Sequence, residues 1–306
     1  MARPILKWAG GKGQLLDELY ARFPDSYDRY HEPFFGGGAL FFDLEPGAGT
    51  INDTNPRLVN FYRQVRDNPI DLIERCREFD DPESAPDASE AFAETTHSGR
   101  DVENYYYQQR ALFNRRPYGY DFDELDEAAR LLYLNRTCFN GLYRENSDRG
   151  FNVPIGRYAD PDWVRADEIR EASEVLEPVD LCNRDFEYVL EEASAGDLVY
   201  FDPPYEPMSA TADFTEYSAD GFDRDDQERL LDVACQLDET GVSVILSNSG
   251  ILSGRYEERG FRVDIEGANR AINSDAENRG EVDEIIATNV APADQRGSDQ
   301  AGLTDF

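Results

Sequence analysis

Short apolar runs alternate with stretches of helical periodicity along the C-terminal half of this chain of 306 residues. Apolar runs bounded by polar or glycine residues are typical of strands, and apolar residues that recur every three to four positions are typical of helices. The predicted strands are 179–183, 197–201, 242–247, 261–265 and 284–290, and the predicted helices are 187–193, 224–237 and 252–259. Strands that alternate with helices indicate an α/β fold with a parallel sheet covered on both faces.

The N-terminal quarter continues this alternation. A helix is predicted over 14–23, a strand over 31–35, a second strand over 50–53 and a helix from Pro56. Glycines follow the first strand, and a polar segment ends the second. Since ligands of such sheets bind at the carboxyl ends of the strands, we expect both segments to contribute to one site.

The middle of the chain, residues 61–166, has mainly helical periodicity and contains an acidic, Pro/Ser/Ala-rich stretch at 80–99 that predicts a flexible loop. The last residues, 291–306, predict a disordered tail.

Charge changes the picture of the surface. The chain has 64 acidic and 30 basic residues, a net charge of −34 and an isoelectric point near 4.2. This excess of carboxylates is typical of proteins that work in concentrated salt, where charge repulsion is strongly screened. Apolar residues make up 40% of the chain, which argues against disorder.

Arginine is segregated within this acidic chain. Residues 105–116 and 128–144 each contain three arginines and no acid. Two interpretations are open: a basic face for phosphate binding, or helices whose arginines are packed inside the protein.

Cysteine and histidine are sparse and scattered. The four cysteines form no Cys-x-x-Cys, and there are only two histidines, so the sequence contains no recognisable zinc site and predicts no metal. Reduced thiols, together with the absence of a signal peptide or a membrane-spanning apolar run, predict a cytoplasmic protein.

Only two lysines occur in the chain, Lys7 and Lys12, and both fall in the segment 7–13. An ammonium on a flexible stem does chemistry that the planar fork of arginine does not reproduce. The pattern therefore indicates a lysine-specific role for this segment.

The peptide Asp202-Pro203-Pro204-Tyr205 follows a predicted strand. An exocyclic amino nitrogen on a base is a poor nucleophile because its lone pair is delocalised into the ring. The carboxylate of Asp202 and the carbonyl of Pro203 are suited to accept its two N–H bonds, because Pro204 restricts the backbone there. The ring of Tyr205 offers a face on which an extruded base can stack.

The glycine segment Gly36–Gly38 allows a ligand close approach to the backbone, and Asp53 at the end of the next strand can accept hydrogen bonds from ribose hydroxyls. A dinucleotide site requires a small residue three positions after Gly38, where this chain has Phe41. The pattern therefore argues against a nicotinamide cofactor.

Six segments in order resemble the Dam-type, or D12 class, of DNA adenine-N6 methyltransferases. They are Leu6–Lys12, Glu32–Gly38, Asp53–Asn55, Asn140–Arg144, Phe151–Gly156 and Asp202–Tyr205. The resemblance implies a Rossmann-like sheet typical of S-adenosylmethionine-dependent methyltransferases, with an inserted, mainly helical target-recognition domain. It further implies a catalytic domain of residues 1–60 and 167–290 and a recognition domain of residues 61–166 with its acidic loop at 80–100.

The same resemblance implies S-adenosylmethionine as methyl donor and double-stranded DNA as partner, with no obligatory protein partner and no membrane. The residues it assigns to the donor are Trp8, Lys12, Phe34, Gly36, Gly38, Asp53, Asp185, Phe186 and Asp202. The residues it assigns to DNA are Lys7, Arg116, Arg136, Phe139, Asn140, Leu142, Arg144 and Pro154. Asp202, Pro203, Pro204 and Tyr205 are the expected catalytic peptide.

Within this resemblance Arg144 is expected to read guanine bidentately, Leu142 and Pro154 to contact a thymine methyl, and Phe139 and Asn140 to fill the space of a flipped adenine. The expected site is GATC. Alternatives are adenine in RNA, the N4 of cytosine, or a catalytically inactive relative that only binds DNA.

Overall fold

The computed structural model describes residues 2–13, 15–80, 101–115, 123–146, 150–158, 161–205, 222–268 and 282–296. Arg116 and most of the acidic stretch at 80–100 lie outside these residues, so their expected roles stay predictions.

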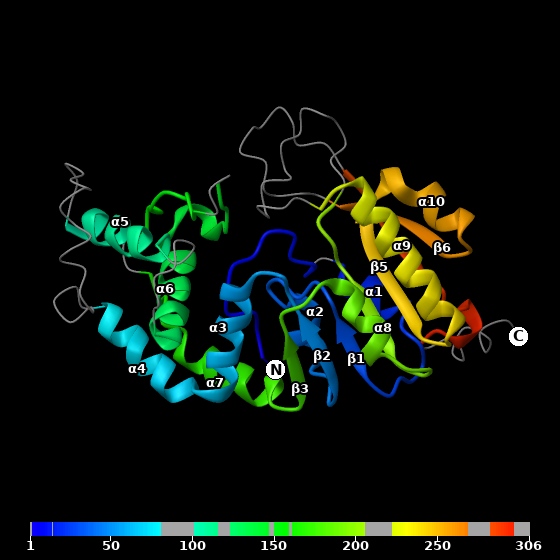
Figure 1. The fold of residues 1–306 in the computed structure, drawn as a ribbon, viewed down its shortest axis with the longest axis horizontal. Coiled ribbons are helices and arrows are strands. Elements are labelled where there is room, and N and C mark those ends of the chain that lie inside the picture. The colour runs from blue at the N-terminus through cyan, green and yellow to red at the C-terminus, as the bar shows by residue number, and fades with distance from the viewer. Residues whose placement is uncertain are drawn as a thin grey trace, which may run out of the picture.

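One seven-stranded sheet forms the body of the protein (Figure 1). Its strands are β1 (Tyr30–Glu32), β2 (Gly49–Asn52), β3 (Val179–Cys182), β4 (Leu198–Phe201), β5 (Ser243–Ser249), β6 (Arg262–Ala268) and β7 (Val282–Thr288), in the order β3-β2-β1-β4-β5-β7-β6. Each coincides within a few residues with a predicted strand, so the predicted α/β class is confirmed.

The expectation of a wholly parallel sheet was wrong for one strand. β7 lies between β5 and β6 and runs antiparallel to both, with Ser249 opposite Glu284 and Arg262 opposite Thr288. Apolar periodicity fixes which face a residue occupies but carries no information on strand direction, so the sequence pattern did not reveal this reversal.

Both faces of the sheet are covered because successive strand residues point to opposite sides. On one face Val199 and Phe201 pack with apolar residues of α8 (Val189–Glu192), α9 (Arg224–Glu239) and α10 (Ser253–Glu258). On the other face Leu198 and Tyr200 join a cluster that includes residues of α1 (Leu16–Tyr20) and α2 (Ala39–Leu44). The core therefore has two layers, and the strands β1, β2 and β4 between them are buried.

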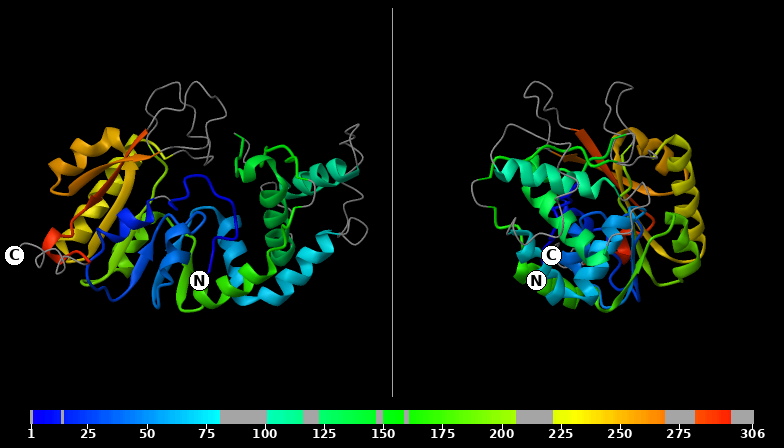
Figure 2. Two further views of the ribbon diagram at one scale, coloured as in Figure 1. Left: turned by 180° about the vertical axis from the view of Figure 1, so that it is seen from behind. Right: turned by 60° about the vertical axis from the view of Figure 1, so that its left-hand side comes forward.

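A group of helices stands beside the β3 edge of the sheet (Figures 1 and 2). It comprises α3 (Pro56–Asp67), α4 (Pro69–Asp80), α5 (Asp101–Phe113), α6 (Glu124–Thr137) and α7 (Ala166–Leu176). Asn55 begins α3 by accepting hydrogen bonds from the amides of Arg57 and Leu58, and Pro56 fits the first helical position. Asp123 caps α6 in the same way.

The chain after α6 folds into a hairpin, hereafter hairpin 138–156. The two arms are joined by Phe139 N–H to the carbonyl of Pro154 at 2.8 Å and by Asn152 N–H to the carbonyl of Arg144 at 3.1 Å. Helix α5 anchors the returning arm, since the hydroxyl of Tyr106 donates to the carbonyl of Val153 at 2.9 Å. The hairpin is therefore held by main-chain contacts that do not depend on its exposed side chains.

Residues 291–296, predicted as the start of a disordered tail, are ordered. They contain a 3-10 helix, Pro292–Asp294, and Arg296 N–H donates to the carbonyl of Phe23 at 2.9 Å. The prediction failed because these polar residues are held by main-chain hydrogen bonds to a segment at the other end of the sequence. Within the described ranges, no helix combines the length and apolar character needed to cross a membrane.

Candidate active site

The segment that carries both lysines, residues 7–13, meets the Asp202–Tyr205 peptide at the carboxyl end of β4. Lys12 Nζ lies 2.9 Å from Asp202 Oδ1 and donates to the carbonyl of Gly10 at 3.0 Å. The same ammonium lies 4.6 Å from the centre of the Tyr205 ring. Lys12 is only 6% exposed and Asp202 is half-buried, so the ammonium is enclosed by protein beside a partly accessible carboxylate.

Lys12 keeps its charge in this enclosed position. Burial alone would lower the pKa of its ammonium, because the charged form loses hydration. The negative charges of Asp202 and of Glu284 act in the opposite direction, as does Tyr205, and the pKa of Lys12 ends above its ordinary value of 10.5. Lys12 is therefore a fixed cation beside the carboxylate of Asp202.

The Asp202–Tyr205 peptide leaves the sheet directly after Phe201, the last residue of β4. Pro203 is buried and Pro204 exposed, while Asp202 and Tyr205 are half-buried. The side chain of Gln227 on α9 donates to the carbonyl of Pro204 at 3.0 Å. The expected catalytic peptide is thus fixed at both its acidic and its proline-rich part.

The glycine segment after β1 packs against Trp8. A Cβ atom added at Gly36 would lie 2.9 Å from the Trp8 ring, and one at Gly37 would lie 2.7 Å from the Trp8 Cβ. Gly36 also has a φ of +50°, which favours glycine. Trp8 in turn stacks on Tyr143 with ring centres 5.1 Å apart. Close contact with the tryptophan therefore explains why glycine is needed here.

Asp53 joins the ends of β1 and β2. Its carboxylate accepts the amide of Gly36 at 3.0 Å and that of Asn55 at 2.8 Å. Burial raises the pKa of Asp53, although these two hydrogen bonds favour its ionised form. The structure brings the predicted ribose acceptor and the predicted glycine segment into direct contact.

Phe34, Asp185 and Phe186 form one cluster beside this segment. Phe34 and Phe186 stack with centres 5.4 Å apart, and Phe186 is buried. Asp185 is exposed, and both of its oxygens lie 3.1 Å from the guanidinium of Arg229 on α9. The guanidinium also lies 4.9 Å from the Phe186 ring. Arg229 was not foreseen from the sequence, since nothing local marks a helix arginine as a partner of a distant loop.

Glu32 is another residue without a predicted role. It ends β1, is 3% exposed, and its Oε2 accepts a hydrogen bond from the Tyr30 hydroxyl at 2.7 Å. Burial and the nearby negative charge of Asp202 raise the pKa of Glu32 well above its ordinary value, although the Tyr30 hydrogen bond opposes this. Its position as an acid at the end of a strand that enters a glycine segment is the sequence feature that could have identified it.

Lys7 connects the site to hairpin 138–156. Its main-chain amide donates to Asn135 Oδ1 and its carbonyl accepts from Asn135 Nδ2, each at 2.8 Å. Its side chain passes over Gly141, where an added Cβ would lie 2.2 Å from Lys7 Cδ, and its Nζ lies 3.2 Å from the Tyr158 hydroxyl. Lysine and glycine at these two positions therefore fit each other.

Most of the predicted DNA-reading residues lie on this hairpin, and four of them are exposed. Phe139 is 45% exposed, and Asn140 has a φ of +56° where the chain turns from α6 into the first arm of the hairpin. Arg144 is exposed, and its Nε–H donates to Asn152 at 2.8 Å. The remaining ones are Pro154, which is exposed, and Leu142 and Arg136, which are half-buried.

One arginine of the acid-free stretches is packed inside the protein and does not contribute to a basic face. Arg130 on α6 is 2% exposed, forms an ion pair with Glu127 and donates to Gln109 at 3.0 Å. It belongs to the packing of the helical group, so the absence of acids around an arginine did not by itself identify a basic surface.

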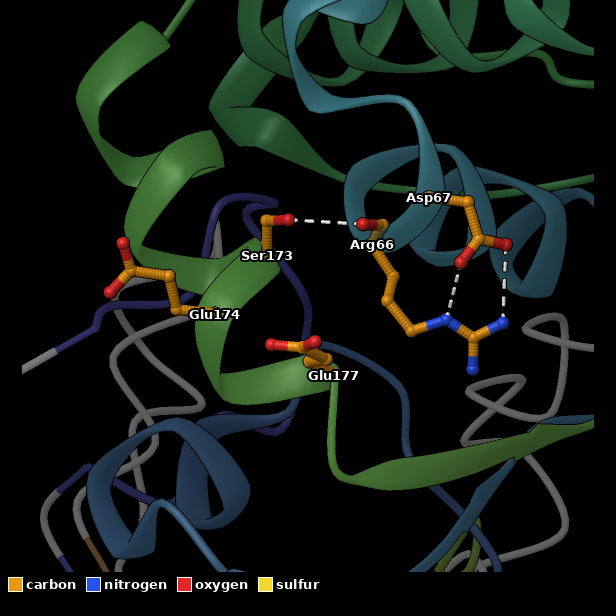
Figure 3. A pocket seen from close by; sticks show the side chains of 5 residues that line it. All are labelled: Arg66, Asp67, Ser173, Glu174 and Glu177. Atoms are coloured by element: carbon orange, nitrogen blue, oxygen red, sulfur yellow. Dashed lines mark hydrogen bonds and ion pairs between the residues drawn. The ribbon is translucent and has the colours of Figure 1, made fainter.

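A hollow of about 440 Å³ lies elsewhere, between the C-terminal end of α3 and helix α7 (Figure 3). It is lined by Arg66, Asp67, Ser173, Glu174 and Glu177. Arg66 reaches the carbonyl of Val179, the first residue of β3, which places the hollow at the amino end of the parallel strands. It therefore contains none of the predicted site residues. In the part of the chain that the structure describes, no group of three potential metal ligands occurs either.

Relatives with established names align over nearly the whole chain. A Type II methyltransferase of Lactococcus lactis subsp. cremoris, M1.LlaDCHI, is 41% identical over 94% of this chain and 95% of its own. The Type II methyltransferase M.MjaIII of Methanocaldococcus jannaschii is 36% identical over 90% and 95%. The DNA adenine methylase of Vibrio cholerae serotype O1 is 32% identical over 93% and 95%.

The family model described as D12 class N6 adenine-specific DNA methyltransferase matches residues 8–287. This range includes Lys12, the glycine segment, hairpin 138–156 and Asp202, which are the elements assembled above. The chain therefore belongs to the D12 class of N6 adenine-specific DNA methyltransferases.

Proposed function

We propose that this enzyme uses S-adenosylmethionine to methylate the adenine of GATC in double-stranded DNA, after the base has been flipped out of the helix. The observation that carries the proposal is the buried Lys12–Asp202 pair at the end of β4, next to the glycine segment held by Asp53. These groups supply a place for a nucleoside-containing donor beside a place for a base.

The residues around the glycine segment fit S-adenosylmethionine. Backbone without side chains at Gly36 and Gly37 permits close approach, and the half-buried carboxylate of Asp53 is an acceptor suited to ribose hydroxyls. Phe34 and Phe186 offer aromatic surface for the adenine moiety, with Asp185 as a polar group beside it. When bound, the donor supplies an electrophilic methyl group on a sulfonium.

Asp202 and the Pro203 carbonyl act on the target amine. Each accepts one N–H hydrogen bond, which draws the nitrogen lone pair out of conjugation with the ring and localises it toward the incoming methyl group. The carboxylate need not be a strong base, because an amine that carries the new methyl group loses its proton readily. Lys12 compensates the charge of Asp202 within the protein, and the Tyr205 ring supports the base from one face.

Hairpin 138–156 is the proposed reading element for GATC. The exposed guanidinium of Arg144 has the fork geometry for O6 and N7 of guanine, and Leu142 and Pro154 offer apolar contacts for a thymine methyl. Phe139 and Asn140, exposed at the start of the first arm, would fill the space of the extruded base. The relatives named DNA adenine methylase support the choice of DNA adenine.

We further propose that residues 1–60 and 167–290 act as the catalytic domain and residues 61–166 as the recognition domain. The net charge of −34 supports function in concentrated salt.

The test is incubation of labelled S-adenosylmethionine with duplexes that contain GATC or one of its single-base variants, in KCl from 0.1 to several molar. Digestion of the product should yield N6-methyladenine from the GATC duplex alone. N4-methylcytosine, transfer to RNA in preference to DNA, or equal transfer to the variant duplexes would each contradict a stated part of the proposal.

A further inference from the structure

A chain of buried side-chain amides stands behind the Asp202–Tyr205 peptide. Gln227 Nε2 donates to the Pro204 carbonyl at 3.0 Å, and Asn248 Nδ2 donates to Gln227 Oε1 at 2.9 Å. Asn248 Nδ2 also lies 3.1 Å from the Tyr256 hydroxyl. Gln227, Asn248 and Tyr256 are 3%, 0% and 2% exposed. They come from α9, β5 and α10, so the chain ties the peptide to three elements of the core.

The direction of these hydrogen bonds is fixed by the backbone. The amide N–H of Ser249 donates to Asn248 Oδ1 at 2.8 Å, and a backbone N–H only donates. Asn248 must therefore present its NH₂ group to Gln227. Gln227 then accepts with its oxygen and presents its own NH₂ group to Pro204. Only a residue with an acceptor and a donor on opposite sides satisfies this position.

The two prolines of the peptide cannot attach it to the core through their own main-chain donors. Neither Pro203 nor Pro204 has a backbone N–H, so neither residue can donate a hydrogen bond to the core. The ring of Pro204 is exposed, yet its carbonyl is held by a buried side chain. Gln227 therefore fixes the peptide directly beyond the Pro203 carbonyl.

We infer that Gln227 is a positioning residue for methyl transfer: through Pro204 it sets the orientation in which Asp202 and the Pro203 carbonyl meet the target amine. The inference rests on the function proposed above and adds a residue to that site. A shift of about 1 Å in a reacting group costs on the order of 100-fold in rate, so a contact that fixes two acceptors has a large effect on chemistry. It has little effect on the binding of donor or DNA.

Two variants of Gln227 test this inference. Gln227→Glu keeps the size but turns an oxygen toward the Pro204 carbonyl, and Gln227→Met keeps an unbranched side chain of similar volume without introducing a buried charge. We expect the single-turnover rate of adenine methylation to fall by about 10- to 100-fold in both. The dissociation constants for S-adenosylmethionine, measured by calorimetry, and for a GATC duplex, measured by fluorescence anisotropy, should each change less than about 2-fold.

The matched control is Gln236→Glu, the same substitution at an exposed position of the same helix. It should methylate at the rate of the unaltered protein. Thermal melting of each protein shows that it is folded at the assay temperature.

A folded Gln227→Met variant that methylates within about 2-fold of the unaltered protein would overturn the inference. So would a rate loss matched by an equal loss of donor or DNA affinity, because that result indicates general damage to the site. If the unaltered protein itself forms no N6-methyladenine, the proposed function fails, and the inference fails with it.

Discussion

Two regions of the protein are built in opposite ways. One is the carboxyl end of the parallel strands, where Lys12 and Asp202 lie, hereafter the catalytic edge, and the other is hairpin 138–156. At the catalytic edge, the charged groups are enclosed and compensated by residues distant in the sequence, as Lys12 is by Asp202. On the hairpin, the side chains of Arg144 and Phe139 are exposed, while the main chain and the buried rings of Tyr143 and Phe151 attach the hairpin to the protein.

This difference corresponds to two kinds of work. Groups that act on a reacting atom are most effective when they are already oriented and shielded from water. Groups that read a large partner must be exposed before it arrives. An enclosed charge is also costly to leave uncompensated, whereas an exposed charge is not, so substitutions in the two regions should have different consequences.

The largest effect is expected at the enclosed pair. Asp202→Asn removes the charged acceptor and should lower the single-turnover rate by about 10³-fold. It also leaves the Lys12 ammonium without its nearest carboxylate, which should cost about 3–5 kcal/mol of unfolding free energy. Rapid-quench kinetics and denaturant titration measure the two effects.

The double variant Lys12→Met with Asp202→Asn separates these effects. It should recover part of the stability, because the uncompensated Lys12 ammonium is removed as well, and should stay inactive. Recovery of turnover would mean that the carboxylate has no chemical role.

The second effect contrasts two arginines of the same acid-free stretch. Arg130→Leu leaves Glu127 buried without its ion-pair partner in the helical group and should cost about 3–5 kcal/mol of unfolding free energy. Preference for GATC over single-base variants should not change at a temperature where the variant is folded. A changed site preference would show that Arg130 contributes to reading after all.

The third effect is the opposite of that at Arg130: site preference should change while stability does not. Arg144→Ala should leave the melting temperature nearly unchanged, because its side chain is exposed. Discrimination at one guanine should weaken by about 1–3 kcal/mol, measured as the ratio of kcat/KM for matched and mismatched duplexes. Altered affinity for the methyl donor with intact discrimination would contradict the assignment.

The smallest effect concerns the sheet beneath the catalytic edge. Buried His31 lies between Thr50 at 2.8 Å and Asp197 at 3.2 Å, and burial lowers the pKa of its ring below 6.5, although Asp197 opposes the shift. As the pH falls, the unfolded chain binds a proton at His31 before the folded protein does. Above about pH 7, His31 is neutral in both states and should not affect the unfolding free energy. As the pH falls below 6.5, protonation of His31 in the unfolded chain should lower the unfolding free energy.

His31→Gln should flatten this part of the stability profile in denaturant titrations between pH 7 and pH 5. An unchanged slope would mean that His31 does not titrate in this range.

Local pattern was sufficient for most of the fold and for the principal site peptides. Strands such as 198–201 are short apolar runs, and segments such as Asp202–Tyr205 carry their chemistry in adjacent residues. Glu284, Gln227 and Arg229 were not found, because each acts across the fold on a residue far away in the sequence. The hydrogen bond from buried Arg130 to Gln109 on α5 and the order of residues 291–296 depend on such long-range partners as well.

The N-terminal segment that carries both lysines has a mechanical consequence. Lys7 is bonded to Asn135 at the base of the hairpin, and Lys12 to Asp202 at the catalytic edge. Five residues of fully extended chain span at most about 18 Å, so this short tether limits how far the two regions can drift apart while both attachments hold. Hairpin 138–156 and the end of the sheet that carries Asp202 should therefore move together.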